Sequence, residues 1–204
     1  MIPSITPVRA FEDHDDTVYA VAVFPDRQCM VTGSEDKTLR LLDLKDDEIV
    51  SKKMEGHQDG VLAISVSGNG QLIASGDFNG NLIAWDGNTG ERLKIIKAYS
   101  SRIYSLNFSP DGTVLATCSP DTATVRLWNT KTWQPQPNPI RCRDRVWGIR
   151  YSPLNGEHLA IATEKNIQIW KPGTMECIAN FKGHRSSQYL THVDTRCTSS
   201  HIGQ

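Results

Sequence analysis

The side chains of this sequence that could do chemistry are histidines that recur together with serine or threonine and with aspartate. His14 and His57 lie 43 positions apart, and each begins a stretch of the same kind. A histidine beside a hydroxyl and a carboxylate could act as the general base of a nucleophilic enzyme. However, the same combination returns at the same place from one stretch to the next, and a chain does not need several identical active sites. The recurrence therefore favours a structural role for these residues.

Other arrangements typical of catalysis or cofactor binding are missing from the sequence. The six histidines are far apart and form no H-x-x-x-H or Cys/His cluster, which argues against a metal site. Gly87–Gly90 lies between expected strands and opens no helix, so it cannot cradle a phosphate in the usual way. We expect no catalytic, cofactor-binding or metal-binding residues and no enzymatic activity.

The composition indicates an ordinary folded intracellular chain. Lysine and arginine number 22 against 23 aspartate and glutamate residues, and a net charge of −1 argues against nucleic acid as a partner. No apolar stretch is long enough to cross a bilayer and no signal peptide is visible, so no membrane partner is expected. Five scattered cysteines without a C-x-x-C pair are typical of free thiols in a reducing compartment. These features predict a cytoplasmic or nuclear location.

A repeat with a steady period organises the chain. Gly56–Val61 reads Gly-His-Gln-Asp-Gly-Val, and Trp85-Asp86 begins 28 positions after its histidine. Successive anchors are 43, 42, 43 and 42 positions apart, at His14, His57, Tyr99, Cys142 and His184. A repeat that recurs every 40–45 residues or so, with Gly-His near its start and Trp-Asp at its end, is the signature of a β-propeller array. From Val8 to His184 the sequence resembles the WD40 repeat family.

The resemblance implies an all-β fold, a β-propeller of WD40 type with about four blades of four antiparallel strands. Residues 1–184 form the repeats, a fifth repeat begins at Gly183, and residues 185–204 are expected to be a divergent, disordered tail. Alternating runs of Val, Ile, Leu and Thr between turn residues support about sixteen short strands. Thr6–Phe11 is expected to be an extra outer strand.

The expected fourth strand of the third repeat is interrupted by prolines. Thr130–Ile140 contains Pro135, Pro137 and Pro139, and proline cannot donate to a strand ladder. The outermost strand of a blade is an edge, where prolines can be accommodated. Trp133, in the same stretch, is expected to be peripheral.

The resemblance also implies a hydrogen-bonded set of histidine, hydroxyl, acidic turn residue and tryptophan in each blade. The second repeat fills all four places, with His57, Ser75, Asn79 and Trp85, although Asn79 brings an amide where the family has an aspartate. Each of the other repeats lacks at least one member. The first has Leu42 in place of the tryptophan, the third has Tyr99 in place of the histidine, and the fourth has Cys142 there and no acidic turn. We expect looser first and fourth blades.

Partner-binding residues are implied at the narrow end of the central channel. In peptide-binding members of the family, the residue five positions after the motif histidine lines that end. Here these residues, with two arginines placed two positions earlier, are Tyr19, Leu62, Tyr104, Trp147, Arg102 and Arg145. Aromatic residues and arginine dominate interface hot spots. The alternative is that these side chains only fill the channel.

A group of arginines and a short motif-like segment can each be interpreted in a simple or in a more specific way. Arg141, Arg143, Arg145 and Arg150 could meet an anionic partner, although a solvated loop is the simpler explanation. Leu127–Lys131 loosely resembles the W-D-x-R box of WD40 substrate receptors of ubiquitin ligases, with Asn129 for Asp and Lys131 for Arg.

Four repeats are fewer than the seven with which WD40 arrays typically close, so the array is expected to be incomplete. The chain is a fragment of a longer protein, or another chain completes its ring, or it closes alone with fewer blades. The leading hypothesis is a non-enzymatic scaffold that presents a propeller face to peptide or protein partners. The alternative is a sensor or regulatory fragment of a larger signalling protein or of a ubiquitin-ligase substrate receptor.

Overall fold

The computed structural model describes residues 13–43 and 51–182, and these contain strands and turns but no helix. Sixteen strands form four four-stranded antiparallel sheets, which we call blades 1 to 4 in chain order. Blade 1 contains β1 (Val18–Val23), β2 (Cys29–Ser34), β3 (Thr38–Asp43) and β4 (Ser51–Glu55). Blade 2 contains β5 (Val61–Val66), β6 (Leu72–Asp77), β7 (Asn81–Asp86) and β8 (Arg92–Lys97). Blade 3 contains β9 (Ser105–Phe108), β10 (Val114–Ser119), β11 (Thr124–Asn129) and β12 (Ile140–Arg141). Blade 4 contains β13 (Val146–Tyr151), β14 (Leu159–Thr163), β15 (Asn166–Lys171) and β16 (Glu176–Lys182).

Short polar turns end the strands. In blade 3 the carboxylate of Asp111 accepts hydrogen bonds from Ser109 Oγ (2.5 Å) and from the backbone N–H of Thr113 (3.1 Å). Gly112 lies at φ +71°, in the left-handed region that glycine adopts without strain. The turn therefore fixes the register between β9 and β10.

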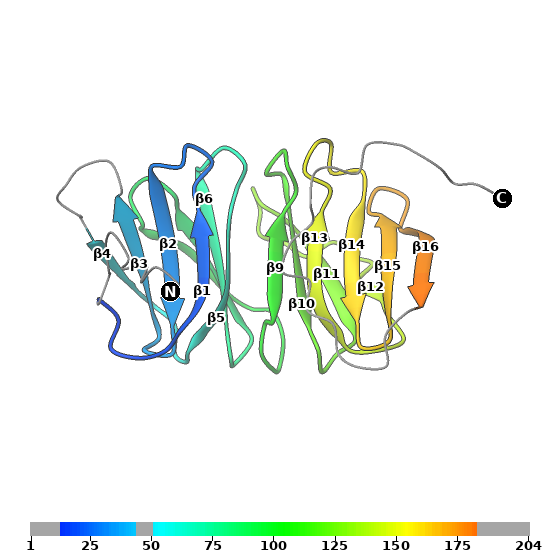
Figure 1. Ribbon diagram of the computed structural model, residues 1–204, viewed down its shortest axis with the longest axis horizontal. Helices are drawn as coiled ribbons and strands as arrows, with labels where there is room; N and C mark the ends of the chain where they lie inside the picture. Colours follow the sequence, from blue (N-terminus) through cyan, green and yellow to red (C-terminus); the bar gives the residue numbers. More distant parts are fainter. Residues whose placement is uncertain (1–12, 44–50, 183–204) are drawn as a thin grey trace, which may run out of the picture.

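The blades follow one another as an arc. The first strand of each blade contacts that of the next, so β1 meets β5, β5 meets β9 and β9 meets β13. Figure 1 shows these inner strands side by side in the middle of the molecule, with blades 1 and 4 at opposite ends. The inner strands thus form one continuous surface, and the outer strands of the blades do not contribute to it.

Apolar cores lie between successive blades. Val31 and Leu39 of blade 1 pack with Val61 and Trp85 of blade 2, and equivalent clusters join blades 2 to 3 and 3 to 4. Gly76 allows blades 2 and 3 to approach closely, because a Cβ there would lie 2.6 Å from Ile103 Cβ. Each blade is therefore stabilised mainly by its neighbours.

The proline-rich stretch is accommodated at the edge of blade 3. The outer strand β12 is only two residues long, and before it one isolated bridge joins Trp128 to Pro135. Trp133 corrects the expectation of a peripheral side chain. It is only 9% exposed and packs in the core between blades 2 and 3, with φ at +57°. Bulky side chains seldom adopt that backbone conformation, so burial of the indole holds it there.

Some expectations lie outside the described residues. They concern Thr6–Phe11, the beginning of a fifth repeat at Gly183, and the tail at 185–204. Within residues 13–43 and 51–182, no helical segment has the length and apolar character needed to cross a membrane.

Candidate functional site

The recurring histidine of blade 2 belongs to a buried hydrogen-bond network. His57 Nδ1 lies 3.0 Å from Asp77 Oδ2, and His57 Nε2 lies 2.7 Å from Ser75 Oγ. The indole N–H of Trp85 donates to the same Ser75 oxygen at 2.8 Å. A carboxylate only accepts, so Nδ1 carries the proton and Ser75 donates its own hydrogen to Nε2. Each of these polar groups is satisfied.

The acidic member of this network is a correction to the sequence analysis. The carry-over from the family pointed to Asn79, whereas Asp77, two positions earlier, reaches the imidazole. Burial opposes ionisation of Asp77, but hydrogen bonds from His57 and Asn81 outweigh it and hold the pKa of the carboxyl below its usual value. Asp77 is therefore a charged residue that the fold stabilises.

This pKa gives a prediction for stability in acid. The unfolded chain protonates Asp77 near pH 4 and the folded chain only at lower pH, so its stabilising contribution is present above about pH 4 and is lost as the pH falls through the folded pKa. Thermal unfolding followed from pH 6 to pH 2.5 should show a shallower loss below pH 4 for Asp77→Asn than for the wild type. Glu91→Gln, at an exposed turn, is the control. Parallel curves for the wild type and Asp77→Asn would contradict the assignment.

Blades 1 and 3 keep most of the network. In blade 1, His14 lies 2.8 Å from both Asp36 Oδ2 and Thr32 Oγ1. Burial opposes ionisation of Asp36, but hydrogen bonds from Thr38 and His14 hold its pKa well below the usual range. In blade 3 the phenol of Tyr99 donates to the carbonyl of Thr117 at 2.8 Å.

Blade 4 has lost the network. Cys142 stands at the histidine position, and Trp170 Nε1 donates to Gln168 of its own strand at 2.9 Å. Burial raises the pKa of the Cys142 thiol to about 12, so the thiol stays protonated at neutral pH and is not an activated nucleophile.

The networks are built to hold strands together. The side chains of His57 and Asp77 have no exposed surface, so a substrate cannot reach them. In the part of the chain that the structure describes, no cluster of His, Cys, Asp or Glu could hold a metal ion. These observations favour the structural interpretation of the recurring histidines.

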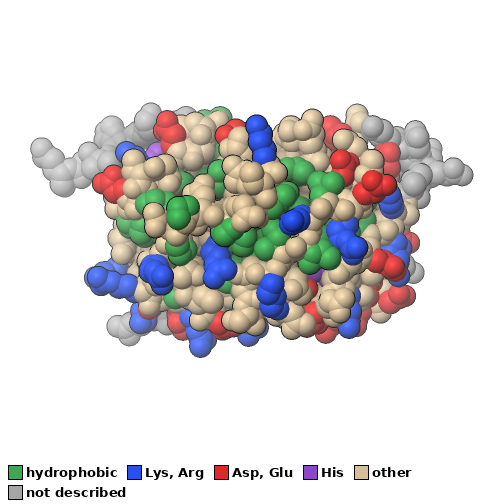
Figure 2. Space-filling model, turned by 180° about the vertical axis from the view of Figure 1, so that it is seen from behind, with side chains coloured by type: hydrophobic (Ala, Val, Ile, Leu, Met, Phe, Trp, Pro, Cys, Tyr) green, Lys and Arg blue, Asp and Glu red, His purple; other side chains and the backbone are tan. Residues whose placement is uncertain are grey.

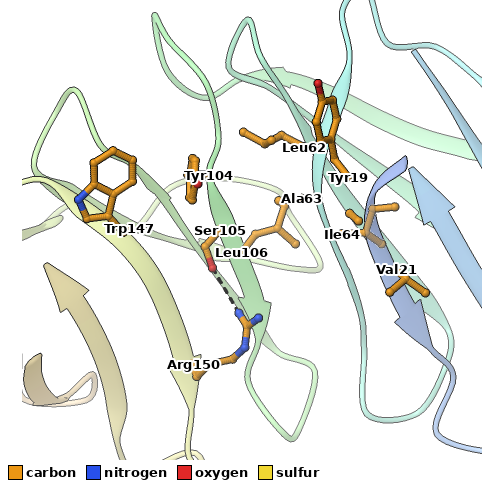
Figure 3. A pocket seen from close by; sticks show the side chains of 11 residues that line it. Tyr19, Val21, Leu62, Ala63, Ile64, Tyr104, Ser105, Leu106, Trp147 and Arg150 are labelled. Carbon is orange, nitrogen blue, oxygen red and sulfur yellow. Dashed lines mark hydrogen bonds between the residues drawn. The ribbon is translucent and has the colours of Figure 1, made fainter. Parts of the chain in front are cut away.

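A groove of about 520 Å³ crosses the inner strands of all four blades, and we call it the inner groove. Figure 3 shows aromatic rings around it, with Tyr104 and Trp147 at one side and Tyr19 beside Leu62 at the other. The lining consists of Tyr19, Ala20, Val21, Leu62, Ala63, Ile64, Tyr104, Ser105, Leu106, Trp147 and Arg150. Residues up to 131 positions apart in sequence therefore share one concave surface.

The aromatic rings of the inner groove are fixed by contacts within the protein. Tyr104 and Trp147 pack edge to face with centroids 5.1 Å apart. Tyr19 packs in the same way on Phe78 at 5.5 Å and donates its hydroxyl hydrogen to Glu35 at 2.8 Å. Tyr19 is nevertheless 41% exposed. Rings that are held in place but still accessible lose little freedom on binding.

Arg150 is a groove residue that the sequence analysis did not place there. Its Nη1 donates to Ser105 Oγ at 3.2 Å and to the Ile149 carbonyl at 2.8 Å. Burial lowers the pKa of the guanidinium, which nonetheless stays charged at neutral pH. The signal in the sequence was an arginine on an inner strand where blades 1 and 2 have Ala22 and Ser65.

The structure brings together four of the six residues expected to bind a partner. Tyr19, Leu62, Tyr104 and Trp147 line the inner groove, whereas Arg102 and Arg145 are exposed and are not part of its lining. The group of four arginines is also divided. Arg150 faces the inner groove, while Arg141 and Arg143 line a different groove.

Comparison with known families agrees with this geometry. The model described as "WD domain, G-beta repeat" matches residues 5–43, 49–86 and 90–129. The chain belongs to the WD40 repeat family. The matched ranges include blades 1 and 2 and the first three strands of blade 3, which keep most of the hydrogen-bond network, and leave out blade 4, which has lost it.

WD40 proteins of several kinds are similar to this chain. WD repeat-containing protein VIP3 of Arabidopsis thaliana is 27% identical over 90% of this chain and 63% of its own length. Protein hir1 of Schizosaccharomyces pombe is 26% identical over 87% of this chain and 22% of its own. A guanine nucleotide-binding protein subunit beta-1 of Nicotiana tabacum is 32% identical over 59% of this chain and 34% of its own. The chain thus spans less than two thirds of the length of each of these relatives. WD40 proteins generally act as non-enzymatic interaction scaffolds.

Proposed function

We propose that this WD40 chain is an intracellular, non-enzymatic scaffold that binds a peptide segment of a partner protein in the inner groove. The observation that carries the proposal is the convergence of Tyr19, Tyr104 and Trp147, from three blades, on one concave surface. Three equivalent positions of separate repeats supply large, rigid rings, which are typical anchors of protein interfaces. Cys118, Cys142 and Cys177 are free thiols, which supports a reducing compartment.

The lining indicates the chemistry of the bound segment. Ile64 and Leu106 form an apolar floor, and Leu62 lies above it at the level of the three rings. Arg150 brings a buried positive charge to the same groove and donates to protein groups through Nη1. We expect an apolar or aromatic side chain of the partner on the floor, with a carbonyl or carboxylate oxygen next to the guanidinium. Arg102 and Arg145 would contribute at the margin of the site.

The test is quantitative capture of partner proteins by purified chain variants. Tyr104→Ala/Trp147→Ala should lose most of the proteins that the wild type enriches, as measured by mass spectrometry. The matched control is Leu93→Ala/Ile95→Ala, since these side chains are 50% and 49% exposed on the outer strand β8 and lie outside the groove. The control should retain the captured set.

A folded double variant that captures the same proteins as the wild type would mean that these rings only fill the groove. Folding is checked by circular dichroism and by the melting temperature. A partner found in this way can then be cut into peptides, and a peptide that binds the wild type but not Arg150→Ala would locate its acceptor oxygen.

A further inference from the structure

A second groove lies at the outer side of blade 4, between the end of blade 3 and the strands β15 and β16. Its volume is about 940 Å³, and we call it the rim groove. β15 and β16 lie at the yellow and orange end of the chain in Figure 1, far from β1. The groove shares no lining residue with the inner groove.

Polar side chains in the sheet itself make this groove. Gln168 pairs with Asn180 across β15 and β16, at the positions where blade 2 pairs Ile83 with Ile95. In blade 2, Ile83 is fully buried in the core between blades 1 and 2. Blade 4 therefore presents amides on the face where blade 2 presents isoleucines.

The amide of Gln168 is held in place by a chain of hydrogen bonds. Gln168 is 6% exposed, its Nε2 donates to Asn166 Oδ1 at 3.1 Å, and its Oε1 accepts from Trp170 Nε1 at 2.9 Å. Thr163 Oγ1 donates to the same Asn166 oxygen at 3.0 Å. A buried glutamine with both ends bonded fixes the floor of the groove before any ligand arrives.

The charges around the groove are unbalanced. Four lining side chains are basic, namely Arg141, Arg143, Lys165 and Lys182, and one is acidic, Asp144. Asp144 is paired with Lys165 at 2.9 Å. Among the described residues, Arg141, Arg143 and Lys182 form no ion pair with a carboxylate. Three positive charges therefore remain around a groove in a chain whose net charge is −1.

The groove has the length and direction of an extended chain. Its lining follows three cross-strand pairs on one face of β15 and β16, namely Asn166 with Lys182, Gln168 with Asn180, and Trp170 with Cys177. Four strand positions correspond to about 13 Å. Side-chain amides can both donate to and accept from the backbone of a peptide laid along them.

We propose that the rim groove binds an acidic peptide segment, rich in aspartate and glutamate, in an extended conformation. Arg141 and Arg143 bind its carboxylates, for which the guanidinium fork is well suited, and Lys182 adds charge at the β16 side. Asn180 bonds the peptide backbone, and Gln168 holds the floor. A peptide fits better than nucleic acid, because the chain as a whole carries a net charge of −1 and the face seen in Figure 2 carries acidic side chains at its margins as well as basic ones, whereas phosphate backbones are recruited by a uniformly basic face. The inner groove and its partner are not needed for this site.

The test uses the whole chain and a fluorescent ten-residue peptide of alternating Glu and Ala, followed by fluorescence anisotropy at low salt. Arg141→Gln/Arg143→Gln should weaken binding at least tenfold. Lys94→Gln/Lys131→Gln removes the same charge from exposed positions elsewhere and should leave binding within twofold. Asn180→Ile, which restores the residue type of blade 2 without changing the charge, should weaken binding several-fold. Melting temperatures confirm that each variant folds.

Three results would overturn the proposal. One is an absence of binding by the wild type. Another is an equal loss in the two double variants, which would mean attraction by net charge alone. The third is tighter binding of the wild type to an oligothymidylate of the same charge than to the peptide, when this affinity is lost in the variant Arg141→Gln/Arg143→Gln.

Discussion

Replacing Trp85 by alanine is expected to lower the free energy of unfolding by about 3–5 kcal/mol, as measured by urea denaturation. The indole is 1% exposed and packs in the core between blades 1 and 2 with Leu39 and Met54. Its removal leaves a cavity there, and it also deprives Ser75 of the hydrogen bond from Nε1. Ser75 in turn bonds His57, so the change reaches the whole network.

Trp170→Ala is the matched comparison, because Trp170 holds the equivalent place in blade 4. Its side chain is half-buried against the core between blades 3 and 4, and its indole N–H donates to Gln168 of the same strand, so the indole makes no hydrogen bond to another strand. The expected loss is about 1–2 kcal/mol. Equal losses for the two variants would show that the network of blade 2 gives no extra stability. Trp85→Phe separates the two causes, since it keeps most of the volume and removes the hydrogen bond.

The fold followed from the sequence because its signal is repeated. Anchors at a steady spacing and alternating apolar residues predicted about sixteen strands in about four blades, and sixteen strands in four four-stranded sheets are observed. The repeat also favoured a structural role for the recurring histidines. What it could not give is the place where one repeat departs from the others, since a departure has no second copy to support it.

The residues that were misplaced show this limit in physical terms. Asn79 occupies the same offset from its histidine as Asp36 does, but the imidazole bonds to whichever carboxylate lies within reach, and in blade 2 that is Asp77. Trp133 follows a turn and precedes prolines, which suggests the surface, yet its ring packs in the core between blades 2 and 3. Spacing fixes the strands, but which side chains meet depends on the local path of the backbone.

The rim groove could not be predicted from the sequence either, although two of its residues had been singled out there. Arg141 and Arg143 were grouped with Arg145 and Arg150 because they are neighbours along the chain. In the fold they join Lys182, about forty positions later, while Arg150 turns to the inner strands. Alternation along β13 and the antiparallel pairing of β15 with β16 decide this division.

The chain of 204 residues is expected to self-associate at micromolar concentration, and Val21→Glu/Val23→Glu should shift it to predominantly monomer. Val21 and Val23 are 60% and 58% exposed on β1, whereas their equivalents in blade 2, Ile64 and Val66, pack against the core between blades 1 and 2. Phe181, on the outer strand of blade 4 at the other end of the arc, is 60% exposed as well. We therefore infer that each end of the arc presents a sheet face of the kind that neighbouring blades cover elsewhere in the molecule, and such contiguous apolar surface drives association.

Sedimentation velocity across a concentration series measures this, with Leu93→Glu/Ile95→Glu as the control. Those two residues are similarly exposed, but they lie on the outer strand of blade 2 and not on an end face, so their replacement should leave the association unchanged. If the ends are covered by a second chain, the wild type should sediment as a defined species rather than a broad distribution, because the two faces of one arc would meet those of another in a closed ring. A wild-type chain that remains a compact, cooperatively melting monomer at these concentrations would contradict the prediction and favour an arc that closes on itself.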